Sequence, residues 1–251
     1  MRLMLFREFR EGWRSFRLPG LLLLAMFFAI LEPPAQKYMG VILEMFAEGM
    51  VIELPPVSSE AAFLQFAGDL NSMVLIASII VTMGIVAREK NNGLTEWFLT
   101  RPVSKKTYIL SKATYLVVTT CLIVALSSLV CAFYTHTLIG PLDPMGVFLA
   151  IVIICTQLLL PLMLTLAVSA ITGVAGVAAG AGIMALFLMS SFDWLMSRSQ
   201  IDWLPLQLNR WLPGALEGSS SPSLWIAVGL SWVLILLLIV ITQADFARRE
   251  V

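Results

Sequence analysis

Histidine is almost absent from this sequence, whose 251 residues contain only His136. One histidine excludes a bis-histidine haem site within a single chain and argues against a multi-histidine metal site. The H-E-x-x-H motif of metalloproteases, the G-x-S-x-G motif of serine hydrolases and the G-x-x-x-x-G-K-[ST] phosphate-binding loop are also missing. We therefore expect no enzyme activity in this chain, and no metal or other cofactor bound to it.

Cysteine and charge are scarce as well. Cys121, Cys131 and Cys155 all lie inside apolar runs, where a thiol behaves as a small hydrophobic group, so we expect no disulfide. Only 13% of the residues are charged, 59% are hydrophobic, and the formal net charge is zero. This balance excludes a water-soluble domain and offers no basic surface for nucleic acid.

Long apolar runs dominate instead. Runs of about twenty residues match the ~30 Å hydrocarbon thickness of a bilayer, and they are too continuous for the alternating strands of a membrane barrel. We predict an all-α polytopic membrane protein in which residues 1–251 form a single transmembrane domain. The six predicted spans are residues 18–36, 71–87, 108–135, 145–169, 174–192 and 223–243. Glu32, Pro33 and Pro34 interrupt the first run, so this span either ends there or is kinked.

Residues 1–17 combine aromatic and basic side chains in a helical pattern. An arginine directly follows each of the four aromatic residues, which recur at spacings of 3, 4 and 3. They are Phe6, Phe9, Trp13 and Phe16. An aromatic face flanked by a basic strip favours an amphipathic helix in the headgroup layer of the membrane, whereas the alternative is a solvated basic helix.

Lysine and arginine are distributed unevenly among the predicted loops. Residues 1–17, residues 88–112 and the C-terminal tail hold thirteen of the sixteen. Because positive loops stay inside, we expect both termini and residues 88–107 to be cytoplasmic, in a multi-pass protein of the plasma (inner) membrane.

Polar groups within the spans are amides and hydroxyls, which weakens the case for ion-coupled transport. Gln157, close to the helix-bending Pro161, is either a helix–helix hydrogen bond or a contact on a substrate pathway. Residues 193–222 carry three tryptophans and two interior prolines, so they form either a re-entrant outer segment or a surface loop with interface anchors.

Small residues mark the fifth span. Gly176 and Gly180 form a G-x-x-x-G pattern, and Gly173 precedes them. Such residues allow helices to approach closely in lipid, so we expect tight packing here, within the chain or across a dimer.

The polar segment between the second and third spans contains aromatic residues. Asn91 or Asn92 can cap a short helix that starts near Gly93, and Pro102 should end it near Thr100. A short amphipathic helix at this place must seat its apolar side chains against lipid, other spans or another protein.

Residues 87–112, AREKNNGLTEWFLTRPVSKKTYILSK, resemble the signature loop of type-2 ATP-binding-cassette export permeases. The amphipathic N-terminus, the six-span layout and the tryptophan-rich outer loop are also similar to that family. Leu94 departs from the pattern, because a threonine is usual after the glycine. The residues that fit are Glu89, Gly93, Glu96, Phe98, Leu99, Pro102, Lys105 and Lys112.

The resemblance implies a permease subunit of an ATP-driven exporter, which forms the path of an unknown substrate. A separate ATPase subunit would bind ATP and Mg²⁺, and a second copy of this chain or a related permease would complete the pathway. The cytoplasmic loop would be the coupling helix, with Trp97 and Phe98 as aromatic anchors. The implied ATPase-binding residues are Glu89, Gly93, Leu94, Glu96, Trp97, Phe98 and Arg101.

Two other interpretations stay open. A membrane scaffold or assembly factor could use the same loop to recruit a soluble partner without moving a substrate. An ordinary positive connector would explain the lysines of the loop but not Trp97 and Phe98.

Overall fold

The computed structural model describes residues 2–46, 58–92, 105–195, 204–219 and 221–248, and every regular element within these ranges is helical. The elements are α1 (Arg2–Arg14), α2 (Arg17–Phe46), α3 (Ser59–Asp69), the π-helix η1 (Leu70–Val74), α4 (Leu75–Asn91), α6 (Lys105–Leu138), α7 (Pro144–Thr172), α8 (Ala175–Leu195), the 3₁₀-helix η3 (Pro205–Trp211), α9 (Leu212–Leu216) and α10 (Pro222–Arg248).

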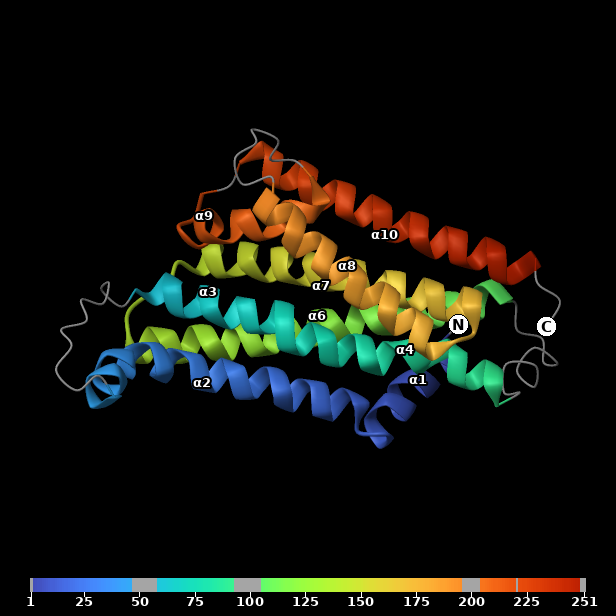
Figure 1. Cartoon of the computed structure of the whole chain (residues 1–251), viewed down its shortest axis with the longest axis horizontal. Coiled ribbons are helices and arrows are strands. Elements are labelled where there is room, and N and C mark those ends of the chain that lie inside the picture. The colour runs from blue at the N-terminus through green and yellow to red at the C-terminus, as the bar shows by residue number, and fades with distance from the viewer. Residues whose placement is uncertain (1, 47–57, 93–104, 196–203, 220, 249–251) are drawn as a thin grey trace.

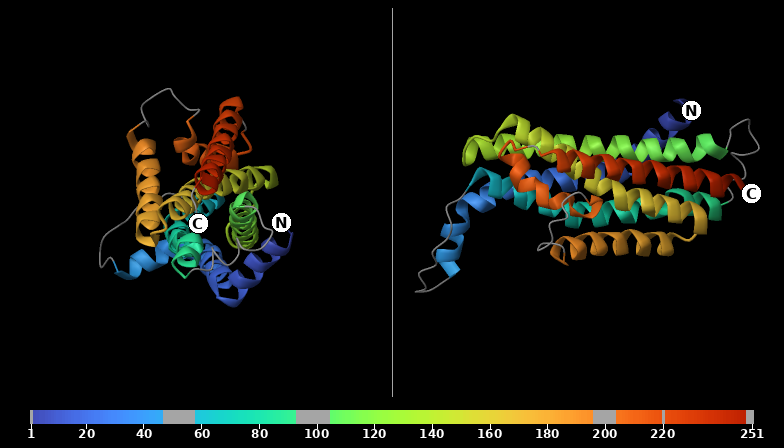
Figure 2. Two further views of the ribbon diagram at one scale, coloured as in Figure 1. Left: turned by 90° about the vertical axis from the view of Figure 1, so that its right-hand side faces the viewer. Right: turned by 90° about the horizontal axis from the view of Figure 1, so that it is seen from above.

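Six helical runs in the described ranges are long and apolar enough to cross a membrane, so the chain is an all-α multi-pass membrane protein. They lie side by side in an elongated bundle (Figure 1). Helix α1, the end of α4, the start of α6 and both chain ends lie at one end of the bundle, called here the α1 end, whereas α9 and the start of α3 lie at the far end (Figures 1 and 2).

Helix α7 forms the centre of the bundle. It packs against α4, α6, α8 and α10. Within its apolar stretch 72% of the residues are buried, whereas the corresponding share is 22% in α2 and in α8. Its bounds follow from local chemistry: Asp143 accepts a hydrogen bond from the backbone N–H of Gly146 at 2.9 Å, and Gly173 ends the helix in the left-handed conformation at φ 69°. The peripheral helices expose leucine, isoleucine, valine and phenylalanine, as a lipid-facing surface requires.

Two spans extend far beyond the bounds that the sequence predicts. Helix α2 does not stop at Pro33 and Pro34 but continues to Phe46, and its outer part leans away from the bundle (Figure 2). This is the kinked alternative, since proline removes a helical hydrogen bond without ending the helix when its neighbours compensate. The second run begins at Ser59 instead of residue 71, because α3, η1 and α4 follow one another without a break and carry Asp69 and Asn71 within the helix.

Hydroxyl groups in the spans mostly bond to their own helices. Ser78, Thr119, Ser127, Thr156 and Thr165 each donate to the carbonyl four residues earlier. Such a bond satisfies a hydroxyl in an apolar environment without a partner from elsewhere. These groups are therefore part of the helix backbone network, and the sites of interest lie where polar groups bridge helices.

Candidate functional site

Residues 93–104 lie outside the described residues, whereas both flanks of this segment lie within them. Its N-terminal flank is the end of α4 and its C-terminal flank is the start of α6, and both lie beside α1 (Figure 1). Five side chains from these three helices meet at this point and are called here the loop-base cluster. They are Arg7, Glu8, Glu89, Tyr108 and Lys112.

Glu89 is the centre of the loop-base cluster. One carboxylate oxygen accepts a hydrogen bond from Arg7 at 2.5 Å, and the other accepts from the Tyr108 hydroxyl and lies 3.0 Å from the Lys112 ammonium. Lys112 also donates to both carboxylate oxygens of Glu8, at 3.2 and 3.3 Å. The cluster thus connects the amphipathic helix α1 to both flanks of the 93–104 segment.

The cluster is buried and its formal charges balance. Lys112 is 1% exposed, and Glu8 and Glu89 are 7% and 8% exposed, so two carboxylates and an ammonium lie out of water. Arg7 supplies the second positive charge. Burial raises the pKa of Glu8 above its ordinary value; Lys112 and Arg7 lower the pKa and Glu89 raises it. Removing a member of such a buried ionic group is costly when it leaves a buried charge without a compensating partner.

Aromatic contacts extend the cluster to the rest of the bundle. Tyr108 stacks on Phe246 of α10 with ring centroids 5.7 Å apart. Phe9 of α1 contacts Tyr115 of α6 edge to face at 5.2 Å. Gly12 faces the Tyr115 hydroxyl so closely that a Cβ there would collide with it. Helix α1 is therefore held against α6 by a specific fit of Phe9 and Gly12 to Tyr115.

The end of α4 is also held by α7. The backbone N–H of Ala87 donates to the Ser169 hydroxyl at 3.1 Å, and that hydroxyl donates to the carbonyl of Met83 at 2.7 Å. Ser169 thus stands between two groups that would bond directly in a regular helix, and insertion of this kind is a recognised cause of helix bending. The last turn of α4, which carries Glu89, is consequently joined to α7 as well as to α1 and α6.

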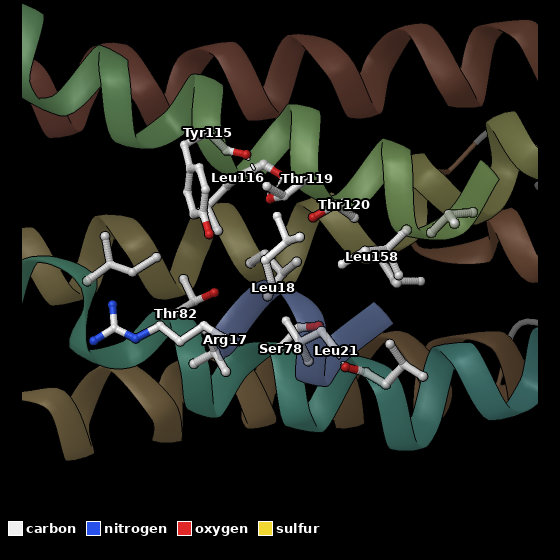
Figure 3. A pocket seen from close by; sticks show the side chains of 16 residues that line it. Arg17, Leu18, Leu21, Ser78, Thr82, Tyr115, Leu116, Thr119, Thr120 and Leu158 are labelled. Carbon is white, nitrogen blue, oxygen red and sulfur yellow. Dashed lines mark hydrogen bonds between the residues drawn. The ribbon is translucent and has the colours of Figure 1, made fainter. Parts of the chain in front are cut away.

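A narrow cavity of about 30 Å³ lies between α2, α4, α6 and α7 (Figure 3). Arg17, Thr82 and Tyr115 are among the side chains that line it. This volume holds about one water molecule. The cavity is therefore too small to hold a substrate in this conformation.

The implied ATPase-binding residues divide into two groups. Glu89 lies within the described residues, where it is buried and bonded to side chains of the same chain. The others lie outside the described residues. They are Gly93, Leu94, Glu96, Trp97, Phe98 and Arg101.

The aromatic face of α1 lies largely on the surface. Phe6 and Trp13 are 69% and 62% exposed, whereas Phe9 is partly buried against Tyr115. Phe16 lies beyond the end of α1 with a left-handed φ of 57°, so it does not continue the helical face that the spacing predicts, and it is 78% exposed. This arrangement fits a helix that presents aromatic side chains to the headgroup layer and its Glu8 face to the spans.

The three predicted packing glycines have different surroundings. A Cβ on Gly176 or Gly180 would meet open space, so within the described chain no neighbour presses on them. Gly173 caps α7 and lies against the Lys90 side chain. The close helix approach occurs at Gly182, where a Cβ would collide with Thr165.

The segment before α10 enters the bundle. Gly146, at the start of α7, lies against the carbonyl of Leu216. Leu206 lines the same cavity as Gln157, and Gln157 follows Gly146 by eleven residues along α7. Eleven helical residues span about 16 Å. The described part of this segment therefore has the inward path of a re-entrant segment, with Leu208 fully buried.

Sequence reasoning missed the residues of α1 that complete the cluster. Glu8 is one of two acidic residues in a mostly basic helix, and it is spaced four residues from Gly12 on the face opposite Trp13. That spacing could have marked the buried face of α1. Its partner Lys112, on a helix 104 residues away, leaves no local signal.

The arrangement defines an all-α multi-pass membrane protein with six candidate spans in its described residues. The match of residues 38–251 places the chain in the family described as "Protein of unknown function (DUF2705)", and the chain belongs to that family. It is also 30% identical over 115 residues to the "Uncharacterized transmembrane protein YxlG" of Bacillus subtilis (strain 168). That match spans 45% of each chain.

Proposed function

We propose that this protein is the permease subunit of an ATP-driven exporter and that residues 93–104 form the loop on which a separate ATPase acts. The observation that carries the proposal is the loop-base cluster. It joins both flanks of this loop to α1 through Glu89, Tyr108 and Lys112. A connector that only joined two spans would need no buried ionic clamp at its base.

The cluster gives a physical route for force. Force on the loop is transmitted directly to Glu89 on α4 and Tyr108 on α6, because these residues lie within one turn of the ends of the 93–104 segment's flanking helices. Arg7 and Glu8 pass it to α1, the Tyr108–Phe246 contact passes it to α10, and Ser169 ties α4 to α7. The loop is thus connected to most of the bundle through rigid contacts.

The remaining features of the proposal follow from charge and composition. The α1 end carries most of the lysine and arginine, so it faces the cytoplasm of the plasma (inner) membrane, with both termini inside. The partner ATPase holds ATP and Mg²⁺. A second copy of this chain, or a related permease, supplies the other half of the pathway, and the open face of α8 at Gly176 and Gly180 leaves room for close contact.

The test is purification of the tagged full-length chain from membranes of its own host. We expect a P-loop ATPase in near-stoichiometric amount and ATP hydrolysis in the purified complex. The Trp97→Ala/Phe98→Ala variant should lose both, because aromatic anchors dominate such interfaces. Trp225→Ala is the matched control: Trp225 is 49% exposed on α10, away from the loop, and its loss should leave the complex intact.

Two results would refute the proposal. Retention of the ATPase in the double variant would remove the coupling role of the loop. Recovery of a soluble partner without nucleotide hydrolysis would favour the scaffold interpretation instead.

A further inference from the structure

A second cavity, of about 260 Å³, lies away from the loop-base cluster, between η1, α4, α7, α8 and η3. Its polar lining consists of amides and hydroxyls, and among the described residues no charged side chain lines it. The polar side chains are Asn71, Ser72, Gln157, Ser190 and Asn209. Four apolar side chains complete the wall: Leu75, Leu186, Met189 and Leu206.

The cavity contains hydrogen-bonding capacity that the described chain does not use. Asn71 donates to the side-chain oxygen of Gln157 at 3.2 Å, but the side-chain oxygen of Asn71 is buried and has no partner in the described structure. Pro161 has no N–H to offer the backbone carbonyl of Gln157 four residues earlier. An unpaired buried acceptor is costly, so it calls for a donor from elsewhere.

Local backbone geometry places these groups together. The π-turn Leu70–Val74 carries Asn71 and Ser72, and single π-turns inside α-helices often occur at functional sites. Gln157 lies near the middle of α7, so the cavity reaches towards mid-membrane depth. Ser190 and Asn209 are exposed, so its mouth is open at the surface of the single chain.

We propose that this cavity binds an uncharged molecule that donates hydrogen bonds through hydroxyl or amide groups and carries an apolar body. Absence of charge follows from the neutral lining, because an ion at this depth would have no counter-charge. The donor requirement follows from the unpaired Asn71 oxygen, and the apolar body matches the four apolar wall residues. The proposal goes beyond the exporter function and does not depend on an ATPase.

The test uses native mass spectrometry of the purified full-length chain with three single-chain lipids as probes. Monooleoylglycerol carries hydroxyl donors and no charge, methyl oleate has the same acyl chain without donors, and oleate carries a negative charge. We expect monooleoylglycerol to be retained at least about fivefold better than the other two, which is the effect of one or two neutral hydrogen bonds.

Variants assign this binding to the cavity. Asn71→Leu and Gln157→Met should each remove the preference for monooleoylglycerol, and Asn209→Ala at the exposed mouth should weaken it even where Asn71→Leu does not fold. Gln65→Ala is the matched control, because Gln65 is an exposed amide of α3 that does not line the cavity. Equal retention of the three lipids, or a preference that survives Asn209→Ala together with Gln157→Met, would overturn the proposal. So would a preference weakened equally by Gln65→Ala. Because no ATPase is present, these outcomes are independent of the exporter test.

Discussion

Replacing Lys112 by methionine is the sharpest test of the loop-base cluster. Lys112 is 1% exposed and lies 3.0 Å from Glu89 and 3.2 Å from Glu8. Without its ammonium, two buried carboxylates face each other and Arg7 is the cluster cation that remains. Removal of one partner from a buried ionic group costs about 3–5 kcal/mol. We expect the Lys112→Met variant to lose this amount in the free energy of unfolding.

The measurement is equilibrium unfolding of the purified protein in mixed micelles with increasing SDS. Lys106→Met is the matched control, because Lys106 is exposed in the same first turns of α6 and its loss should cost within about 0.5 kcal/mol. Glu8→Gln should cost no more than about 1 kcal/mol, since burial already disfavours the charged form and a glutamine oxygen can still accept from Lys112.

The double variant separates a cluster from a set of independent contacts. Glu8→Gln combined with Lys112→Met removes one of the two carboxylates that Lys112 contacts, so it should be more stable than Lys112→Met alone. If Lys112→Met unfolds like Lys106→Met, or if the double variant loses the sum of the two single effects, the structural role assigned to the cluster is wrong.

Three further outcomes are expected. Gly182→Val should destabilise the protein by about 1–3 kcal/mol in the same unfolding assay, because there is no room for its side chain, whereas Gly176→Val should have little effect on a single chain; equal effects would contradict the packing described here. Gly12→Ala should weaken the packing of α1 against α6 and lower the thermal unfolding temperature. Tyr115→Phe should partly restore that temperature because it removes the colliding hydroxyl, and absence of this rescue would argue against the contact. The pKa of Glu8 is raised in the folded state, so the folded protein holds the Glu8 proton more tightly than the unfolded chain does. This proton binding stabilises the folded state fully below the unfolded pKa, and the stabilisation is lost as pH rises through the folded pKa. Wild type should therefore lose stability relative to Glu8→Gln as pH rises above about 4.5, and parallel pH profiles of the two proteins would refute this.

Much of the architecture could be predicted from local sequence patterns. Apolar runs identified all six spans because lipid requires about twenty continuous apolar residues. The bounds failed where polar residues lie within a helix: Glu60 and Asp69 lie in α3, the part of the second run that the prediction left out, and Pro33 and Pro34 lie within α2 without ending it. In both places neighbouring helices, invisible in the local pattern, compensate for the unfavourable residues.

The candidate site was only half predictable. The aromatic pattern of residues 1–17 marked the exposed side of α1, but the role of the opposite side depends on tertiary contacts. The family resemblance implied a partner-binding role for Glu89, and no local pattern indicated that it is buried. Its burial depends on Arg7 and Lys112 arriving from other helices to balance its charge.

The sequence by itself determined that this chain spans a membrane six times, where the spans lie and that a polar segment separates the second span from the third, because these properties depend on hydropathy and length. Only the tertiary structure decided which polar groups are shared between helices. The pairing of Lys112 with Glu8 joins residues 104 positions apart, and the amide of Asn71 reaches Gln157 across 86 positions. Such contacts depend on which helix faces pack together, and that packing is a property of the whole bundle.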